Sequence, residues 1–271
     1  MPLAVCATPI GNLDDITLRV LAELRDADVV LAEDTRHTRG LLERHGIRAR
    51  LLSYHEHNEA ARVAELLPRL EAGERMALVS DAGLPGISDP GARLIAAALD
   101  AGVPVTVLPG PSAVETALVA SGLVGSRYAF VGFLPRKAGE LDELWHETAE
   151  WGFPVVAFES PHRLGATLGS LARVDPEREV AVCRELTKRF EEVARGTAGE
   201  LARRLTEPPK GEVTLVIGRA SASSDPDVAR QEAARNAVAE LVAAGTPRRV
   251  AAEVVARLTD TSRNALYRGS L

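Results

Sequence analysis

Most of the side chains in this chain that could do chemistry stand in five short polar segments. Each segment follows an apolar run of the kind that forms a buried strand, and most are shaped by glycine and proline. Loops at the carboxyl ends of neighbouring parallel strands meet at one edge of a sheet, so one composite site is expected there. The five segments are Ala7–Asp15, Glu33–Thr38, Ser80–Gly91, Leu108–Glu115 and Phe158–Arg163.

The segment Ser80–Gly91 is the most informative of the five. Its three glycines permit close approach of backbone to a ligand, and its two prolines keep it from being floppy. We predict that Asp89 caps the following helix, with Pro90 in the first turn, so that backbone N–H groups point out of the loop. Such a loop can hold a ligand that carries a ribose, a carboxylate or a phosphate.

Two further segments combine helix-capping patterns with acidic side chains. Ser112 and Glu115 fit the S-x-x-E capping box, and Ser160 is predicted to cap a helix that begins at Pro161. Glu159 stands at a strand end, where a side chain can point into a cleft; a surface ion pair is the alternative. The segments Leu108–Glu115 and Ser80–Gly91 are predicted to form opposite walls of one pocket.

Basic side chains lie in or near the same loops, where they could hold phosphates. Neither G-x-G-x-x-G nor G-x-x-x-x-G-K-[ST] occurs, which argues against the usual dinucleotide and nucleoside triphosphate sites. Two well-separated cysteines make no metal-type pair, so no metal site is expected and both are predicted to be buried thiols of a cytosolic protein. The basic residues are Arg36, Arg39, Arg136, Lys137, Lys188 and Arg189.

The elements that position these loops alternate between strands and helices, which indicates an α/β fold. Helical spacing predicts a helix around Thr38–His45 and another over Glu59–Ala72 that is broken or kinked near Pro68. Apolar runs predict strands over Val29–Ala32, Met76–Val79, Val105–Leu108 and Val155–Glu159.

Residues 1–121 are predicted to form a first α/β domain on a largely parallel sheet. Residues 122–220 form a second, with a mixed sheet because two strands, Glu179–Arg184 and Glu191–Arg195, follow one another directly. A polar link, Ser221–Pro226, leads to a helical extension over residues 227–271.

Charge is unevenly distributed along the 271 residues. The total is −6, which argues against a protein that coats nucleic acid without specificity, yet residues 245–271 carry +3. That tail indicates either an anionic partner or solvated arginines. No apolar run is long enough for a membrane helix, and the first residues lack the features of a signal peptide.

The chain resembles the bacterial small-subunit rRNA ribose methyltransferases of the tetrapyrrole methylase (class III) superfamily. The resemblance extends in order along nearly the whole chain, and it includes the tail segment Ser262–Tyr267. It rests on Thr8–Thr17, Ala32–Thr38, Ser80–Gly91, Pro109–Ala113, Phe133–Lys137, Phe158–Leu164, Arg184–Lys188 and Lys210–Glu212.

The resemblance implies two α/β domains with S-adenosylmethionine in the cleft between them, a homodimer, and a cytoplasmic enzyme without a membrane partner. The implied reaction is 2′-O-methylation of a cytidine in the decoding region of 16S rRNA within the small ribosomal subunit. The loops Glu33–Thr38 and Phe133–Lys137 are assigned to RNA, with Arg36, Arg39, Arg136, Lys137 and Arg189 as the residues that bind it. The implied cofactor residues are Pro9, Asp81, Leu84, Pro85, Ser112 and Ala113.

A ribose hydroxyl is a weak nucleophile at neutral pH, so a base or a cation should assist its loss of a proton. The candidates for this role are Glu33, Asp34, Glu159 and Lys188, and the sequence does not choose among them. One alternative is a tetrapyrrole or corrinoid methyltransferase of the same superfamily. A second is a DNA-binding protein that uses the C-terminal helices as a helix-turn-helix.

Overall fold

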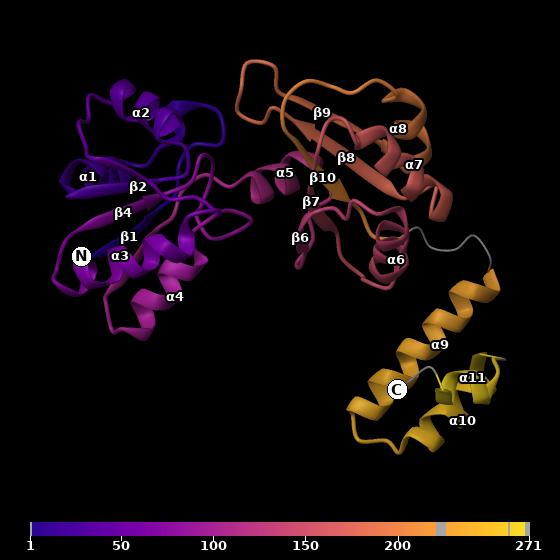
Figure 1. Ribbon diagram of the computed structural model, residues 1–271. Helices are drawn as coiled ribbons and strands as arrows, with labels where there is room; N and C mark the ends of the chain where they lie inside the picture. Colours follow the sequence, from indigo (N-terminus) through magenta and orange to yellow (C-terminus); the bar gives the residue numbers. More distant parts are fainter. Residues whose placement is uncertain (1, 221–225, 260, 269–271) are drawn as a thin grey trace. The chain divides into compact units, whose positions relative to one another are not determined.

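The computed structural model describes residues 2–220, 226–259 and 261–268. The chain divides into two compact units, residues 1–220 and 221–271. The larger unit contains two five-stranded sheets, which confirms the α/β class, and the described part of the smaller unit is helical (Figure 1). Both sheets belong to one compact unit, so the division into domains 1–121 and 122–220 stays a prediction.

The first sheet is parallel throughout and has the strand order β3-β2-β4-β1-β5. All four residues of β1, β2 and β4 are buried, as expected for parallel strands covered on both faces. The five strands are β1 (Leu3–Cys6), β2 (Val29–Ala32), β3 (Leu51–Ser53), β4 (Met76–Val79) and β5 (Val105–Leu108).

Helices cover both faces of this sheet because successive side chains of a strand point to opposite sides. Ala4 packs in one cluster with α1 and α2, whereas Leu3 packs in another with α3 and α4. The carboxyl ends of the strands remain open for loops. The helices are α1 (Leu18–Asp26), α2 (Thr35–Arg44), α3 (Glu59–Glu71) and α4 (Ala92–Asp100), and a short 3-10 turn, η1 (Leu13–Asp15), precedes α1.

The second sheet is mixed, as predicted, with the order β6-β7-β10-β8-β9. Only β6 and β7 pair in parallel, and the remaining pairs are antiparallel. Helices α6, α7 and α8 cover one face, and α5, which comes from the first half of the chain, packs on the other. The elements are α5 (Ala113–Ser121), β6 (Ala129–Phe133), α6 (Ala138–Ala149), β7 (Val155–Glu159), α7 (Leu164–Val174), β8 (Glu179–Arg184), β9 (Glu192–Thr197), α8 (Ala198–Arg204) and β10 (Val213–Ile217).

Several predicted helix starts were wrong. Gly91, not Asp89, is the N-cap of α4, and α7 begins at Leu164 rather than Pro161, because Ser160–Arg163 form a separate turn. Helix α2 begins three residues before the predicted start, since the Asp34 side chain accepts a hydrogen bond from the Arg36 backbone N–H (2.8 Å). Helix α3 includes Pro68 without a break, so of the two predicted alternatives, a break or a kink, the break is wrong.

The smaller unit contains helices α9 (Pro226–Ala243), α10 (Arg248–Thr259) and α11 (Arg263–Arg268). Buried side chains from all three, among them Val238, Val255 and Leu266, form its core. Residues 221–225 of the predicted polar link lie outside the described part of the chain, and a helix-turn-helix role for α10 and α11 stays a prediction. Within the described residues, none of the helices is long and apolar enough to cross a bilayer.

Candidate functional site

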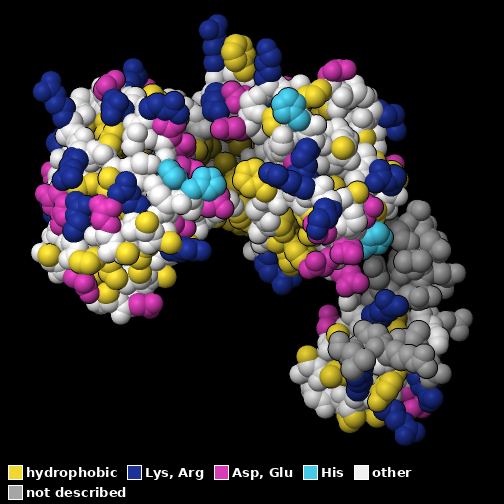
Figure 2. Space-filling model, in the orientation of Figure 1, with side chains coloured by type: hydrophobic (Ala, Val, Ile, Leu, Met, Phe, Trp, Pro, Cys, Tyr) yellow, Lys and Arg dark blue, Asp and Glu magenta, His cyan; other side chains and the backbone are white. Residues whose placement is uncertain are grey.

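A cavity of about 750 Å³ lies in the larger unit. Its walls come from the loops after β2, β4, β5 and β7 and from residues of the second sheet, including Cys183 and Thr214. Figure 2 shows a hollow in the middle of the larger unit with hydrophobic side chains at its back. The volume is in the range of small-molecule and cofactor sites. The predicted composite site therefore exists as one cavity.

The loop Ser80–Gly91 is fastened to the loop after β1. Thr8 and Gly83 exchange backbone hydrogen bonds of 2.8 and 3.1 Å, and Thr8 Oγ1 donates to the Ser80 carbonyl (3.0 Å). Gly83 has φ +78°, which only glycine adopts without strain. At the other end, the Gly91 N–H donates to Glu59 Oε1 (2.8 Å). The loop is thus a fixed wall rather than a flexible flap.

The loop after β5 forms another wall, and Gly110 permits its close approach to β1. A Cβ atom on Gly110 would lie 2.9 Å from the Cβ of Ala7. The predicted capping box is absent: Ser112 Oγ donates to the Glu115 carboxylate, which also accepts from Tyr128 OH (2.5 Å). Both side chains bond to each other instead of to the helix backbone.

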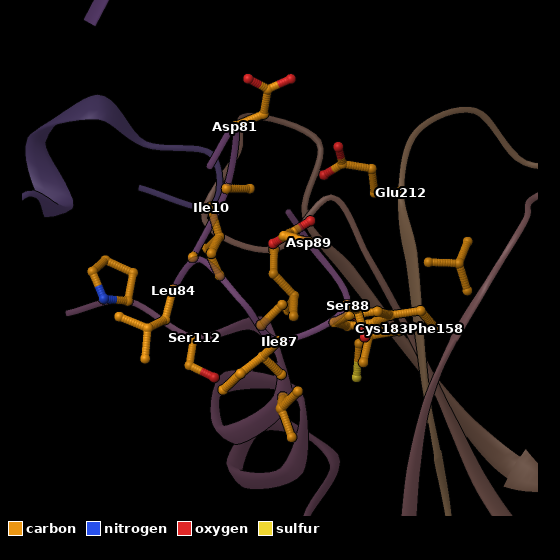
Figure 3. Close-up of a pocket in the computed structure, with 18 of the residues that line it drawn as sticks. Ile10, Asp81, Leu84, Ile87, Ser88, Asp89, Ser112, Phe158, Cys183 and Glu212 are labelled. Atoms are coloured by element: carbon orange, nitrogen blue, oxygen red, sulfur yellow. The ribbon is translucent and has the colours of Figure 1, made fainter. Parts of the chain in front are cut away.

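Four of the six predicted cofactor residues line the cavity, namely Asp81, Leu84, Ser112 and Ala113. Pro9 and Pro85 are buried and lie outside the lining. In Figure 3 the carboxylates of Asp81, Asp89 and Glu212 lie in the upper part of the view and the apolar side chains of Leu84, Ile87 and Phe158 lie below them. The cavity therefore offers an acidic side and an apolar side to one ligand.

Three of the carboxyl groups in the lining, those of Glu33, Asp81 and Asp89, lie close enough for their charges to affect one another. The Asp81 N–H lies 3.5 Å from Glu33 Oε2, and Asp81 Oδ1 accepts from the Asp34 N–H (3.1 Å). Burial and the charges of Glu33 and Asp81 raise the pKa of Asp89 to about 7. Burial and the charge of Asp81 also raise the pKa of Glu33. Two carboxyl groups of the cavity are therefore tuned toward neutral pH.

Asp34 differs from these groups because it lies outside the lining and is paired with a cation. Its carboxylate accepts from Arg36 Nε (3.2 Å) and Nη2 (2.8 Å). The hydrogen bonds from the Arg36 side chain and backbone hold the pKa of Asp34 well below its usual range. A carboxylate with so low a pKa is a weak base.

Glu159 lines the cavity, but its side chain is completely buried and fully bonded. It accepts from the Ser160 N–H (2.7 Å) and Thr167 Oγ1 (2.5 Å), and Arg163 Nη1 lies 3.3 Å away. Its place in the lining agrees with the predicted side chain in a cleft, whereas the ion pair with Arg163 is buried on the carboxylate side and is not the surface pair of the alternative. These contacts fix the turn after β7.

Lys188 is outside the lining and bridges two carboxylates. Its Nζ donates to Glu185 Oε1 and Glu212 Oε2, both at 2.9 Å, and Glu212 faces the cavity. Burial opposes the charged form, but the two acceptors outweigh it and raise the pKa of Lys188. The ammonium group thus links the residue that follows β8, Glu185, to the residue that precedes β10, Glu212.

The five residues predicted to bind RNA are exposed and lie outside the lining. Arg36 is paired with Asp34, Lys137 with Glu140 (2.7 Å), and Arg189 lies over the ring of Phe190. In the part of the chain that the structure describes, Arg39 and Arg136 have no acidic partner. They are therefore available to an external anion.

Sequence reasoning missed three groups in the cavity. Asp89 was assigned only a capping role, and Glu212 carried no assignment of its own, since its position on the wall depends on β10 and Lys188. Phe133 was named within a loop but not as a wall; it is 65% exposed and contacts Phe158 edge to face (5.4 Å). Phe133 belongs to the apolar residues that precede a polar loop, and that position was the signal that could have identified it as a wall residue.

Comparisons with known proteins point to one family. The family model of the tetrapyrrole (corrin/porphyrin) methylases matches residues 2–202. A ribosomal RNA small subunit methyltransferase I of Neisseria meningitidis serogroup B is 42% identical over 98% of this chain and 91% of its own length. A protein of the same name from Synechocystis sp. is 43% identical over 99% and 97%.

Solved structures share the fold at low sequence identity. The methyltransferase CobJ superimposes with a TM-score of 0.62 at 19% identity and covers 80% of this chain and 93% of its own. A uroporphyrin-III C-methyltransferase from Thermus thermophilus, solved with S-adenosylhomocysteine, gives 0.56 at 20% identity and covers 80% and 96%.

Proposed function

This chain belongs to the tetrapyrrole (corrin/porphyrin) methylase family, and we propose that it transfers a methyl group from S-adenosylmethionine to the 2′-oxygen of a cytidine ribose in the decoding region of 16S rRNA. The observation that carries the proposal is the match to small-subunit rRNA methyltransferases at about 40% identity over nearly the full chain, together with a cavity whose walls are the matching loops.

The residues of the cavity fit the proposed cofactor. S-adenosylmethionine supplies a methyl group on a positively charged sulfur and carries a ribose, an adenine ring and an amino acid. The acidic side with Asp81 and Asp89 favours a positive charge, and the apolar side with Leu84, Ile87 and Phe158 favours an adenine ring. Gly83 and Gly110 also line the cavity, where the lack of a side chain leaves their backbone accessible to a ligand.

The chain's own residues can assist the acceptor in two ways. First, a fixed cavity that holds donor and acceptor in line supplies much of the rate of a displacement. Second, the 2′-hydroxyl must lose its proton as the new C–O bond forms, and Glu33 and Asp89 have pKa values raised toward neutral pH, as a proton acceptor requires. Asp34 and Glu159 are assigned positioning roles instead, because Arg36 and the turn after β7 occupy their oxygens.

The RNA partner is assigned to the exposed basic residues around the cavity. Arg36 and Arg39 on α2, Arg136 and Lys137 after β6, and Arg189 after β8 supply positive charge on an otherwise acidic chain. Phosphate contacts of this kind orient a nucleic acid without reading its bases. The proposed substrate is the small ribosomal subunit, which places the activity in the cytoplasm.

We further propose that the enzyme acts as a homodimer. Val107 on the edge strand β5 and Val119 on α5 are more than half exposed, as is Val124 after α5. An edge strand with exposed apolar side chains is a surface that proteins usually cover. Sedimentation of the full chain at micromolar concentration tests this; a monomer throughout would contradict it.

The test of the proposed reaction is methyl transfer from labelled S-adenosylmethionine to isolated small subunits. We expect label in the rRNA and none in tetrapyrrole or corrinoid substrates offered in parallel. Label in a tetrapyrrole and none in the subunits would instead assign the chain to the family's small-molecule enzymes. The variant Asp81→Ala is expected to lose cofactor binding in calorimetry while it remains folded.

A further inference from the structure

Phe190 is an exposed aromatic side chain that the proposed reaction leaves unexplained. It stands in the connection between β8 and β9 and is 66% exposed. The guanidinium carbon of Arg189 lies 5.5 Å from the centre of its ring. Figure 2 shows hydrophobic atoms between Lys and Arg side chains at the top of the view, above the β8–β9 connection of Figure 1. Single exposed aliphatic residues such as Leu18 are ordinary, so Phe190 is distinguished by the combination of an exposed ring, a neighbouring cation and a position on a segment that reaches the cavity.

The connection that carries Phe190 is held in one conformation. The Lys188 N–H donates to the Glu185 carbonyl (3.0 Å), and the Glu191 N–H donates to the Lys188 carbonyl (3.1 Å). Glu185 and Thr187 have φ values of +50° and +65°, which are costly for residues with a Cβ and especially for a β-branched one. Such strain persists only where the surroundings enforce it, and it occurs most often at functional sites.

The same connection reaches the cavity. Leu186 is buried and lines it, and Thr187 Oγ1 accepts from the Asn12 N–H (2.9 Å) in the loop after β1. Phe190 is four residues from Leu186, so the two lie at most about 14 Å apart along the chain. A group on the Phe190 ring can therefore belong to the same RNA segment as the nucleotide in the cavity.

An exposed ring beside a guanidinium is the arrangement on which proteins stack unpaired nucleobases, while the cation also attracts the phosphates. We propose that Phe190 and Arg189 form a stacking platform for an unpaired base of the RNA substrate, near the nucleotide whose ribose enters the cavity. This inference rests on the proposed function, and it adds a contact to a base, whereas Arg36, Arg39, Arg136 and Lys137 are assigned to phosphates alone.

The first test compares variants in methyl transfer to small subunits. Phe190→Ala is expected to lower kcat/KM for the subunits by roughly 5- to 150-fold, the range that one stacked base supplies, with cofactor affinity unchanged in calorimetry. Phe190→Trp should retain activity, and Leu18→Ala, an exposed apolar residue on α1, is the matched control. If the wild type is active and Phe190→Ala equals it, the platform is refuted while the proposed function stands. A wild type that labels no subunits refutes the proposed function.

A second test does not depend on catalysis. In the full-length Phe190→Trp variant, a short single-stranded oligocytidylate is expected to quench the fluorescence of the new tryptophan, because bases stacked on an indole quench it. Native Trp145 is completely buried but Trp151 is only partly buried, so the wild type is titrated in parallel and its response is subtracted as the background. The quench should weaken in Arg189→Ala and be absent with duplex RNA. An unchanged spectrum with the single strand, or an equal quench by the duplex, would overturn the proposal.

Discussion

The carboxyl group of Asp89 has two neighbours of its own charge, Glu33 and Asp81, in a partly buried wall. Like charges and loss of water both favour its protonated form, so its pKa rises to about 7 from the ordinary 3.8. A raised pKa lowers the stability of the folded protein at high pH, but it suits a group that accepts a proton. Glu33 shares this property, whereas the charge of Asp34 is neutralised by Arg36.

Replacement of Asp89 tests this cost. The folded protein binds the Asp89 proton more tightly than the unfolded chain does, so the group favours folding at low pH. That contribution is lost as pH rises from about 4 to about 7. Asp89→Asn should therefore raise the free energy of unfolding near pH 8 by up to about 2 kcal/mol, allowing for solvent screening, and change it little near pH 4. Urea denaturation at both pH values measures this; equal effects at both would contradict the raised pKa.

Glu33 and Glu159 both line the cavity but should respond differently to the loss of charge. Glu33→Gln is expected to lower kcat by about 100-fold or more with a normal melting temperature, as for a lost proton acceptor. Glu159→Gln should cost about 2 kcal/mol of stability, because Ser160, Thr167 and Arg163 lose a buried charged partner. Kinetics and thermal unfolding of both variants measure these effects. A Glu33→Gln variant that loses stability, or a Glu159→Gln variant that loses only kcat, would contradict the assigned roles.

At the scale of elements, the close contact between the loop after β1 and the β8–β9 connection depends on one small residue, Gly11. A Cβ on Gly11 would lie 2.5 Å from Lys188 Cγ and 2.8 Å from the Leu186 carbonyl oxygen, and part of that obstacle is backbone. The two segments come from different sheets, so Gly11 governs how closely they meet beside the cavity.

Gly11→Ala is expected to destabilise the protein by about 1–3 kcal/mol and to reduce methyl transfer to RNA, because the β8–β9 connection must shift. The matched control is Gly139→Ala on α6, where a Cβ meets nothing within 4 Å and where alanine favours the helix. Chemical denaturation of the pair gives the comparison. A Gly11 variant as stable as its control would mean that the close approach is unimportant.

Elements were more predictable from sequence than their junctions. The strands β2, β4, β5, β7 and β8 match their predicted bounds, because buried apolar runs between turns are a local signal. The predicted caps failed at Asp89 and Ser160, and Ser112 is the N-cap of α5 as predicted but bonds Glu115 instead of the helix backbone, because the surroundings decide what a polar side chain bonds. The role of Glu212 was unpredictable for the same reason, since its partner Lys188 is 24 residues away in the chain.

On the scale of the whole molecule, the cavity and the net-positive tail belong to different compact units. Every residue that lines the cavity lies before residue 215, whereas five arginines lie in residues 245–271. The unit 221–271 is thus unnecessary for the cavity, and its charge is of the sign that RNA attracts.

A chain that ends at residue 220 is therefore expected to bind S-adenosylmethionine with unchanged affinity. It should use small subunits less well, and with a shallower dependence on salt, because fewer cations contact phosphates. Calorimetry and transfer assays at two salt concentrations measure both effects. Lost cofactor binding in a folded truncated chain would contradict the assignment of the site to the larger unit.

The central claim is that the cavity directs a methyl group to one ribose of the small-subunit rRNA. The most direct measurement is mass spectrometric mapping of that rRNA, taken from cells that lack this gene and then incubated as subunits with the enzyme and S-adenosylmethionine. The account predicts a single new methyl group on the 2′-oxygen of a cytidine in the decoding region. A methyl group on a base, methylation elsewhere in the rRNA, or an unmodified rRNA would contradict it.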